Sequence, residues 1–188
     1  ETGLVLVGRD VNDASAHNIY ISNVDYGLNI NNSTALPQVH MLGSNQFGGA
    51  MRSYSLTDPE QLQPTYILSG ATRSDYSHDA SSFLVNDERA ERDCVNTTSA
   101  GCTVLLDFNE QTLRLWDHSN LESAVELSAI SYPDAEYTHS GWWSEDRQYV
   151  ILHDELDEQR RGLNTTVHIF NISDLNQPTL VSTWSGPT

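Results

Sequence analysis

The sequence predicts an all-β protein made of a repeated four-stranded sheet. Three histidines, His17, His78 and His139, stand 61 positions apart in the chain. Each is followed by a series of short apolar and aromatic runs of strand length, which polar turn residues separate. Apolar residues with helical spacing are absent over any long stretch. A long period that holds several strand signals is typical of a repeat fold.

Each repeat opens at its histidine and contains four candidate strands. The histidines sit in Ser15-Ala16-His17-Asn18, Tyr76-Ser77-His78-Asp79 and Tyr137-Thr138-His139-Ser140. In the first repeat we expect strands at 19–21, 39–42, 51–56 and 65–68. The second repeat has them at 82–85, 104–107, 113–117 and 124–127, and the third at 142–143, 149–152, 167–172 and 180–184. Polar turns such as 57–59 and 173–175 divide the third strand from the fourth.

This strand pattern favours a β-propeller over its competitors, a β-sandwich and a β-helix. Central runs such as 104–106 and 150–152 lack clean alternation, which indicates sheets that are covered on both faces. One four-stranded unit cannot bury both faces alone, so neighbouring units must stack. A β-helix normally has a much shorter period.

We expect one propeller domain with blades at 15–75, 76–136 and 137–188, and the end of a preceding blade at 1–14. Propellers commonly have about four to eight blades. Three blades cannot close such a ring. The chain is therefore expected to be part of a larger ring, completed by the remaining blades of the same protein or by other subunits.

The charge argues against two classes of partner. The chain has 9 arginines, no lysine and 26 acidic residues, for a net charge of −17. Nucleic acid and anionic membrane surfaces both require a basic face. No run approaches the roughly 18 apolar residues of a membrane span. The acidity fits cation binding, a saline habitat or solubility alone.

Cysteine and asparagine patterns predict an extracellular or cell-surface location. Cys94 and Cys102 are the only cysteines, and they flank a stretch rich in Asn, Thr, Ser and Gly. A loop-closing disulfide is expected, with two free thiols as the alternative. Glycosylation sequons begin at Asn31, Asn32, Asn96, Asn164 and Asn171, and the first two overlap. Together these features favour a secreted glycoprotein.

The repeated histidines are candidate metal ligands. In a propeller the first strand of each blade lines the channel, so His17, His78 and His139 would converge at one mouth. Converging imidazoles can hold a transition metal. Asp79 is a candidate to orient a ring nitrogen of His78. Alternatively, each imidazole bonds the backbone of the neighbouring blade and orders channel water, or the histidines bind an organic ligand.

The run 153–158 contains four acidic residues and offers a second cation site. Its carboxylates could bind calcium, although the run lacks the spacing and glycine of an EF-hand loop. Asp154 and Glu155 could also join the histidine site. The alternative is a solvated acidic loop that Arg160 and Arg161 neutralise through surface ion pairs.

The remaining motifs give no catalytic residue. Trp142 and Trp143 follow His139 directly, and we expect one ring to pack between blades, with a stacking platform for a ligand as the alternative. The sequence holds no G-x-S-x-G, H-E-x-x-H, G-x-G-x-x-G or P-loop motif. Paired carboxylates for glycoside hydrolysis stay open, because their separation is spatial.

The chain resembles the choice-of-anchor B family of secreted propeller proteins with LVIVP-type repeats. The matching segments are 15–18, 76–80, 107–113, 137–142, 154–158, 162–166 and 185–188. The resemblance implies more blades on either side and an extracellular or cell-surface location, and it implies little about activity. His153 departs from the pattern because an acidic residue is expected there, and the Cys94–Cys102 loop looks like a local elaboration.

Two functions follow as hypotheses. The first is a surface-associated module for binding, adhesion or assembly, with a protein or glycan partner and a possible metal ion. The second is a secreted metalloenzyme with a transition metal in the histidine ring. Fold-level analogy alone supports the second.

Overall fold

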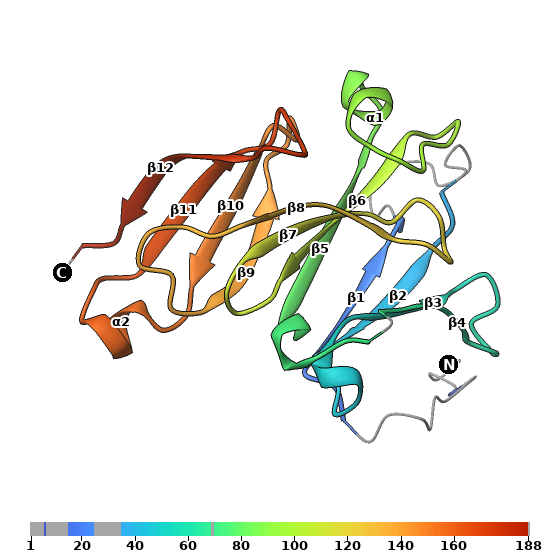
Figure 1. The fold of residues 1–188 in the computed structure, drawn as a ribbon, viewed down its shortest axis with the longest axis horizontal. Coiled ribbons are helices and arrows are strands. Elements are labelled where there is room, and N and C mark those ends of the chain that lie inside the picture. The colour runs from blue at the N-terminus through green and yellow to red at the C-terminus, as the bar shows by residue number, and fades with distance from the viewer. Residues whose placement is uncertain (1–5, 7–14, 25–34, 69, 188) are drawn as a thin grey trace, which may run out of the picture.

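Three four-stranded antiparallel sheets make up the described part of the chain, residues 6, 15–24, 35–68 and 70–187 of a computed structural model (Figure 1). The first sheet contains β1 (Asn18–Ser22), β2 (Gln38–Leu42), β3 (Arg52–Ser55) and β4 (Gln63–Ile67). The second contains β5 (Asp79–Val85), β6 (Cys102–Phe108), β7 (Leu113–Asp117) and β8 (Val125–Ile130). The third contains β9 (Thr138–Trp143), β10 (Tyr149–Asp154), β11 (Thr166–Asn171) and β12 (Thr179–Ser185). The predicted all-β repeat of four strands is confirmed.

In every sheet the strands lie in chain order, so each is a simple antiparallel meander. Each sheet falls inside one of the expected repeats at 15–75, 76–136 and 137–188. The described residues do not close a ring. Of the preceding blade expected at 1–14, only Leu6 is described, and that expectation stays a prediction.

Among the described residues, two one-turn α-helices lie between strands. The first, α1 (Glu88–Arg92), lies between β5 and β6, and the Asp87 side chain caps it by accepting from the Arg89 amide. The second, α2 (Asp157–Arg161), lies between β10 and β11 and occupies the end of the acidic run. Short 3-10 turns cover Phe47–Gly49 (η2) and Arg73–Asp75 (η3). No helix among the described residues is long and apolar enough to cross a membrane.

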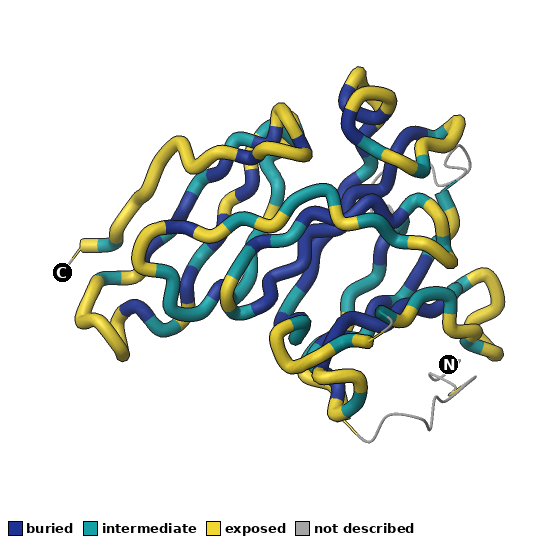
Figure 2. The backbone as a smooth tube through the Cα atoms, in the orientation of Figure 1, coloured by how far each residue is buried: buried dark blue, intermediate teal, exposed yellow. Residues whose placement is uncertain are grey.

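Apolar contacts bury both faces of the second sheet. Leu105 packs toward the first sheet, with Trp116, Leu42 and Met51. The flanking β6 residues Val104 and Leu106 instead join a larger cluster with the third sheet. All seven residues of β6 are buried, as Figure 2 shows for the centre of the molecule. This explains why the run 104–106 has no polar alternation.

The first strands of the three sheets lie side by side. The Asn18 side chain in β1 donates to Asp79 Oδ1 in β5 at 2.9 Å. The ring of His78, just before β5, is 3.2 Å from the carbonyl oxygen of His139 in β9. In both contacts the partners are 61 positions apart. The sequence period is therefore a spatial repeat as well.

The disulfide is confirmed, and the alternative of two free thiols is wrong. Cys94 and Cys102 are bonded and close a loop between α1 and β6. Asp117, at the end of β7, fastens this loop because its Oδ2 accepts from the amides of Val95 and Asn96.

A buried polar network joins the first sheet to the second. His118, just after β7, is 3.2 Å from Ser53 Oγ through Nε2 and 3.3 Å from Gln38 Nε2 through Nδ1. His40 Nδ1 lies 2.8 Å from the same Ser53 Oγ, and its Nε2 lies 2.8 Å from Ser22 Oγ. Burial lowers the pKa of His118 to about 4. Burial, and then the neighbouring His118, hold the pKa of His40 well below its ordinary value.

This network predicts a loss of stability in mild acid. The unfolded chain binds a proton at a histidine below about pH 6.5, whereas folded His118 does so only near pH 4. The contribution of neutral His118 to the free energy of unfolding is therefore complete above about pH 6.5 and is lost as the pH falls toward 4. For His118 alone the loss is on the order of 3 kcal/mol. Urea unfolding at about pH 7.5 and about pH 4.5, in chelator, measures it.

The variant His118→Gln removes the titrating ring and should narrow the difference between the two urea midpoints. The exposed His17 provides the control. Its ring is only a secondary cause, after burial, of the lowered pKa of His78, so His17→Gln should keep most of the difference seen in the unchanged chain. Equal pH dependence in both variants would contradict a role for the buried network.

Candidate metal centre

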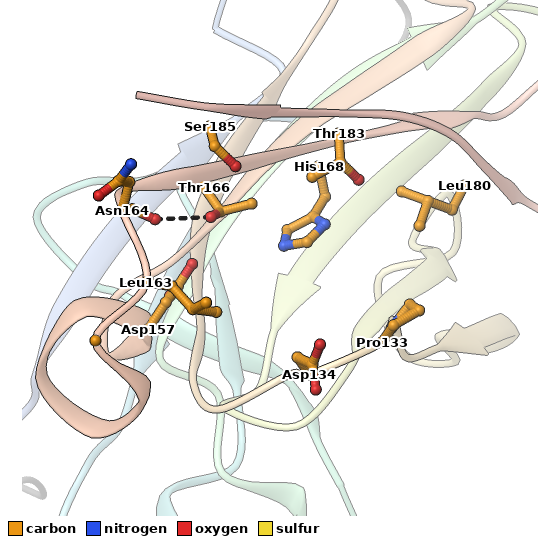
Figure 3. Close-up of a pocket in the computed structure, with 11 residues that line it drawn as sticks. Pro133, Asp134, Asp157, Leu163, Asn164, Thr166, His168, Leu180, Thr183 and Ser185 are labelled. Atoms are coloured by element: carbon orange, nitrogen blue, oxygen red, sulfur yellow. Dashed lines mark hydrogen bonds between the residues drawn. The ribbon is translucent and has the colours of Figure 1, made fainter. Parts of the chain in front are cut away.

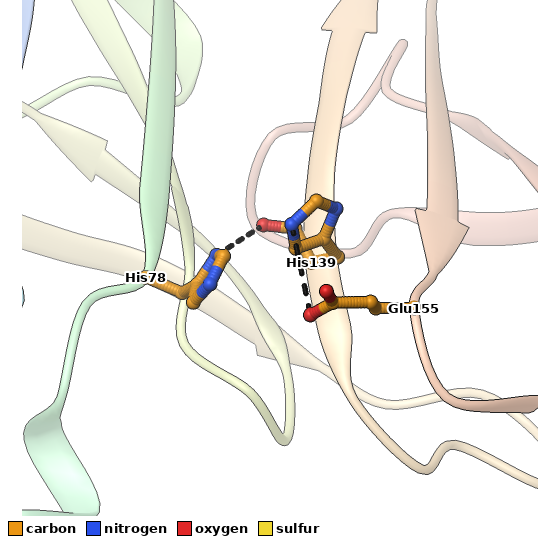
Figure 4. A group of neighbouring side chains, drawn as sticks. All are labelled: His78, His139 and Glu155. Carbon is orange, nitrogen blue, oxygen red and sulfur yellow. Dashed lines mark hydrogen bonds and ion pairs between the residues drawn. The ribbon is translucent and has the colours of Figure 1, made fainter. Parts of the chain in front are cut away.

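Two histidines and a glutamate converge where the second and third sheets meet. His78 directly precedes β5, His139 lies in β9, and Glu155 follows β10. One ligand-capable atom from each lies within 4.8 Å of the others. Figure 4 shows His78 facing His139 and Glu155 across the gap between the two sheets. His78 is buried, His139 is half-buried and Glu155 is exposed, so a metal ion here would remain reachable from solvent.

A β-bulge presents His139. In the ladder of β9 and β10, Ser140 pairs with His153 and Thr138 pairs with Asp154, which leaves His139 between them without an opposite residue. Such bulges bend a strand and redirect a side chain. The Glu155 amide donates to the Tyr137 carbonyl at 3.1 Å, which holds Glu155 beside the bulge.

Close packing of β9 on the second sheet brings the ligands together. Gly141 makes this approach possible, because an added Cβ would lie 2.5 Å from the Ile151 carbonyl oxygen and 2.9 Å from the Phe108 ring. On the other side, the His78 amide donates to the Phe108 carbonyl at 2.8 Å. Phe108 therefore contacts the strand segments that carry both histidines.

The hydrogen bond of His78 leaves a nitrogen available for a metal. Its Nδ1 lies 3.2 Å from the His139 carbonyl oxygen, which can only accept. Nδ1 therefore carries the proton and Nε2 keeps its lone pair. Burial, and then the nearby His17, lower the pKa of His78. The ring is accordingly neutral at neutral pH, as metal binding requires.

His153 supports His139 from behind. Its Nε2 lies 2.7 Å from His139 Nδ1, and its Nδ1 lies 3.4 Å from Ser140 Oγ. When His139 donates through Nδ1, its Nε2 is free and faces Glu155 Oε2 at 3.7 Å. Burial, followed by the charge of His139, lowers the pKa of His153. Sequence reasoning noted His153 only as a departure from an acidic pattern and missed this role.

The structure brings the three predicted histidines together. The ring centroids of His17 and His78 are 4.1 Å apart, and those of His78 and His139 are 4.6 Å apart. His17 lies outside the group of three ligands but next to it. The aromatic ring of Tyr137 borders the site, with its centroid 5.1 Å from that of His78.

Asp79 does not have the role that the sequence suggested. Its Oδ1 accepts from the Asn18 side chain and from the Ala80 amide, at 2.9 and 2.8 Å. The group that orients His78 is the carbonyl of His139 instead. Asp79 joins β1 to β5, and its short side chain is engaged there.

Asp154 also lies away from the metal group. Its Oδ2 accepts from the Tyr132 hydroxyl and the amides of Glu136 and Tyr137, and its Oδ1 accepts from the Leu156 amide. Although burial acts in the opposite direction, the amide hydrogen bonds hold the pKa of Asp154 below its ordinary value. Successive residues of an extended chain point in opposite directions, so Asp154 points inward while Glu155 points outward.

The acidic run does not form one cluster of carboxylates. Asp157 is buried in α2 beside Asp154, and burial and then the charge of Asp154 raise the pKa of Asp157. Glu158 instead accepts from the Thr165 hydroxyl. Arg160 and Arg161 pair with Glu136, outside the run, at 3.6 and 2.5 Å. The group of three ligands takes only Glu155 from this run. Arg160 and Arg161 do form surface ion pairs as expected, but their partner is Glu136 and not an acid of the run.

The two tryptophans divide as expected only in part. Trp143 packs against the core cluster, with its ring centroid 6.1 Å from that of Phe83. Trp142 is 53% exposed. The rings of Trp142 and Trp143 are stacked with centroids 5.6 Å apart, so the two side chains contact each other instead of pointing apart.

Three of the five sequons fall on described residues. Asn96 and Asn164 are half-buried, and their side-chain amides donate to the carbonyls of Ser123 and Gly186 at 3.0 Å each. Asn171 accepts from the Ser173 amide. Asn31 and Asn32 lie outside the described residues. Glycosylation stays a prediction at all five.

Comparison with known proteins gives no family for this chain. No protein-family model matches it, and no curated protein matches its sequence.

A substitution at Asp154 tests its structural role. Asp154 accepts four hydrogen bonds through its two oxygens, and Asp154→Asn turns one of these oxygens into an NH2 group that cannot accept, so the free energy of unfolding should fall by about 2–3 kcal/mol. Urea unfolding at neutral pH in chelator measures the change. Asp146, exposed in the β9–β10 turn, offers the control Asp146→Asn, which should cost well under about 1 kcal/mol. Equal effects would contradict the role given to Asp154.

Proposed function

We propose that this chain belongs to a secreted β-propeller that binds a transition metal through His78, His139 and Glu155 and serves as a surface-associated binding, adhesion or assembly module. The observation that supports the metal site best is the convergence of three ligand atoms, within 4.8 Å, from two different repeats. His17, whose ring lies 4.1 Å from that of His78, is the candidate fourth ligand.

The donor set favours a transition metal over calcium. Imidazole nitrogen suits zinc, copper, iron and nickel, whereas calcium takes oxygen ligands in larger number. Two histidines and a carboxylate leave coordination positions open. An open position on an exposed metal could take an oxygen or nitrogen ligand from a protein or glycan partner. This connects the metal to the binding role.

The outer face of the third sheet supports the propeller arrangement. Ile151 pairs with Ile169 and Trp142, and it is 38% exposed. The equivalent of Ile151 in the second sheet is Leu106. Ile151 pairs with Trp142, three residues after His139, and Leu106 pairs with Ser81, three residues after His78. Leu106 is fully buried against the third sheet. A further blade on the third sheet would bury Ile151 in the same way.

The disulfide, the five sequons and the resemblance to choice-of-anchor B proteins support the extracellular assignment. Disulfides persist in oxidising compartments and are rare elsewhere.

Metal titration tests the site. Calorimetry with Zn²⁺ on chelator-stripped protein should give one site per chain, and Co²⁺ should give the visible spectrum of nitrogen and oxygen coordination. His78→Ala and His139→Ala should abolish this binding, because each removes a ligand. His153→Gln should weaken it about 10–100-fold, as expected for a residue that orients a ligand.

Glu155→Gln should also weaken Zn²⁺ binding, whereas Glu145→Gln, at an exposed acid in the β9–β10 turn, should leave it unchanged. Circular dichroism and urea unfolding establish that each variant is folded. Folded His78→Ala and His139→Ala proteins that keep the affinity of the unchanged chain would refute the proposed site.

The exposed face gives a separate test of the propeller arrangement. The unchanged 188-residue chain should self-associate at raised concentration, because Trp142, Val181 and Trp184 are more than half exposed on the third sheet. Ile151→Asp should weaken this association in sedimentation velocity. Val95→Asp, at an exposed residue of the disulfide loop, should not. A monomer at every concentration would count against an apolar blade interface here.

A further inference from the structure

A cavity of about 520 Å³ lies at the outer edge of the third sheet, away from the histidine site. Its walls come from β11, β12, α2 with the segment that follows it, and the loop between β8 and β9 (Figure 3). The ring of His168 in this wall lies with its centroid 4.2 Å from that of the buried Tyr132. The cavity therefore opens on the side of the sheet that faces the second sheet, opposite the exposed face of Ile151.

Two buried side chains in the wall have polar atoms without a hydrogen-bond partner. Asp157 and His168 are 3% and 6% exposed. Asp157 Oδ1 and His168 Nδ1 are closed to solvent and make no hydrogen bond with the described residues, although the Asp157 carboxyl lies close to the Thr166 hydroxyl and the Asp154 carboxyl. A buried polar atom without a partner lowers stability, so such an atom indicates that a partner is missing. Figure 3 shows the His168 ring projecting from its strand toward Asp134 and Leu163.

The cavity wall contains acceptors and negative charge but no cationic side chain. Asp134 and Asp157 are both in the wall, and no arginine of the described chain lines it. Arg161 reaches Asp134 at 2.7 Å from outside the cavity. Burial lowers the pKa of His168, so its ring is neutral and can accept a hydrogen bond.

Apolar side chains complete the wall. Pro133, Leu163 and Leu180 lie around the polar groups. A cavity of this kind, apolar with a few placed polar groups, is typical of a small-molecule site.

We propose that this cavity binds a primary alkylammonium group, with the ammonium at Asp157 and His168 and the alkyl stem against Leu163 and Leu180. An ammonium has three donors and no acceptor, which matches a carboxylate oxygen and an imidazole lone pair that lack partners. Binding at His168 requires its imidazole to turn, because Nδ1 has no exposed surface in this structure. The chain contains no lysine, so its own side chains cannot supply this group.

Two sources share this chemistry, a free polyamine and the lysine side chain of a partner peptide. Calorimetry in chelator with n-butylamine and 1-butanol tests the ammonium itself, because the two probes have similar stems and differ in charge. Butylamine should bind at least about 10-fold more tightly, since each 1.4 kcal/mol of lost charge-assisted bonding corresponds to a tenfold change. Equal binding of the two probes would overturn the proposal.

Variants locate the binding. Asp157→Asn, an isosteric change, should weaken butylamine binding about 10-fold or more, and Leu180→Trp should block it by filling the cavity with the charges intact. Glu145→Gln removes an exposed acid elsewhere and should leave the affinity unchanged. Butylamine affinity that is retained in folded Leu180→Trp, or that falls equally in Glu145→Gln, would overturn the proposal.

Spermidine and a lysine-containing tripeptide then distinguish the sources. Tighter binding of spermidine identifies a free amine, and tighter binding of the peptide identifies a partner side chain. Binding of neither would refute the site. All these measurements use chelator-stripped protein, so their outcome is independent of the proposed metal centre.

Discussion

Burial of the second sheet on both faces is the constraint on which the rest of the structure depends. Leu105 packs toward the first sheet while Leu106 packs toward the third, so one strand supplies both apolar layers. A sheet buried on both sides needs a neighbour on each side. The three sheets therefore stack, and their first strands meet along one line.

That stacking is what assembles the candidate metal centre. Sheets that pack face to face bring equivalent strand starts into contact, and His17, His78 and His139 are equivalent by sequence period. Contact alone does not make a ligand set. The bulge at His139 and the close approach at Gly141 orient one ring toward Glu155, and the His139 carbonyl fixes the tautomer of His78.

Histidines occupy two different environments in this chain. His40 and His118 are buried between the first two sheets, where burial lowers the pKa of both rings and hydroxyl and amide groups are their hydrogen-bond partners. His78, His139 and His153 lie at an open edge, and their mutual contacts leave nitrogen lone pairs for a ligand. His168 stands apart, with a ring nitrogen that has no partner. The separation matters because the first group is expected to affect stability in acid, while the others belong to the two proposed binding sites.

The sequence by itself determined the strands, their grouping in fours, the repeat period and the disulfide, because strand periodicity, turn residues and a short cysteine spacing are local signals. It also named His78, His139 and Glu155 as site candidates. It could not tell that Asp154 points inward while the adjacent Glu155 points toward the metal group, and it did not show that His153 supports His139. Only the tertiary structure decided these roles, because a strand pairing and one bulged residue set which side chains face each other.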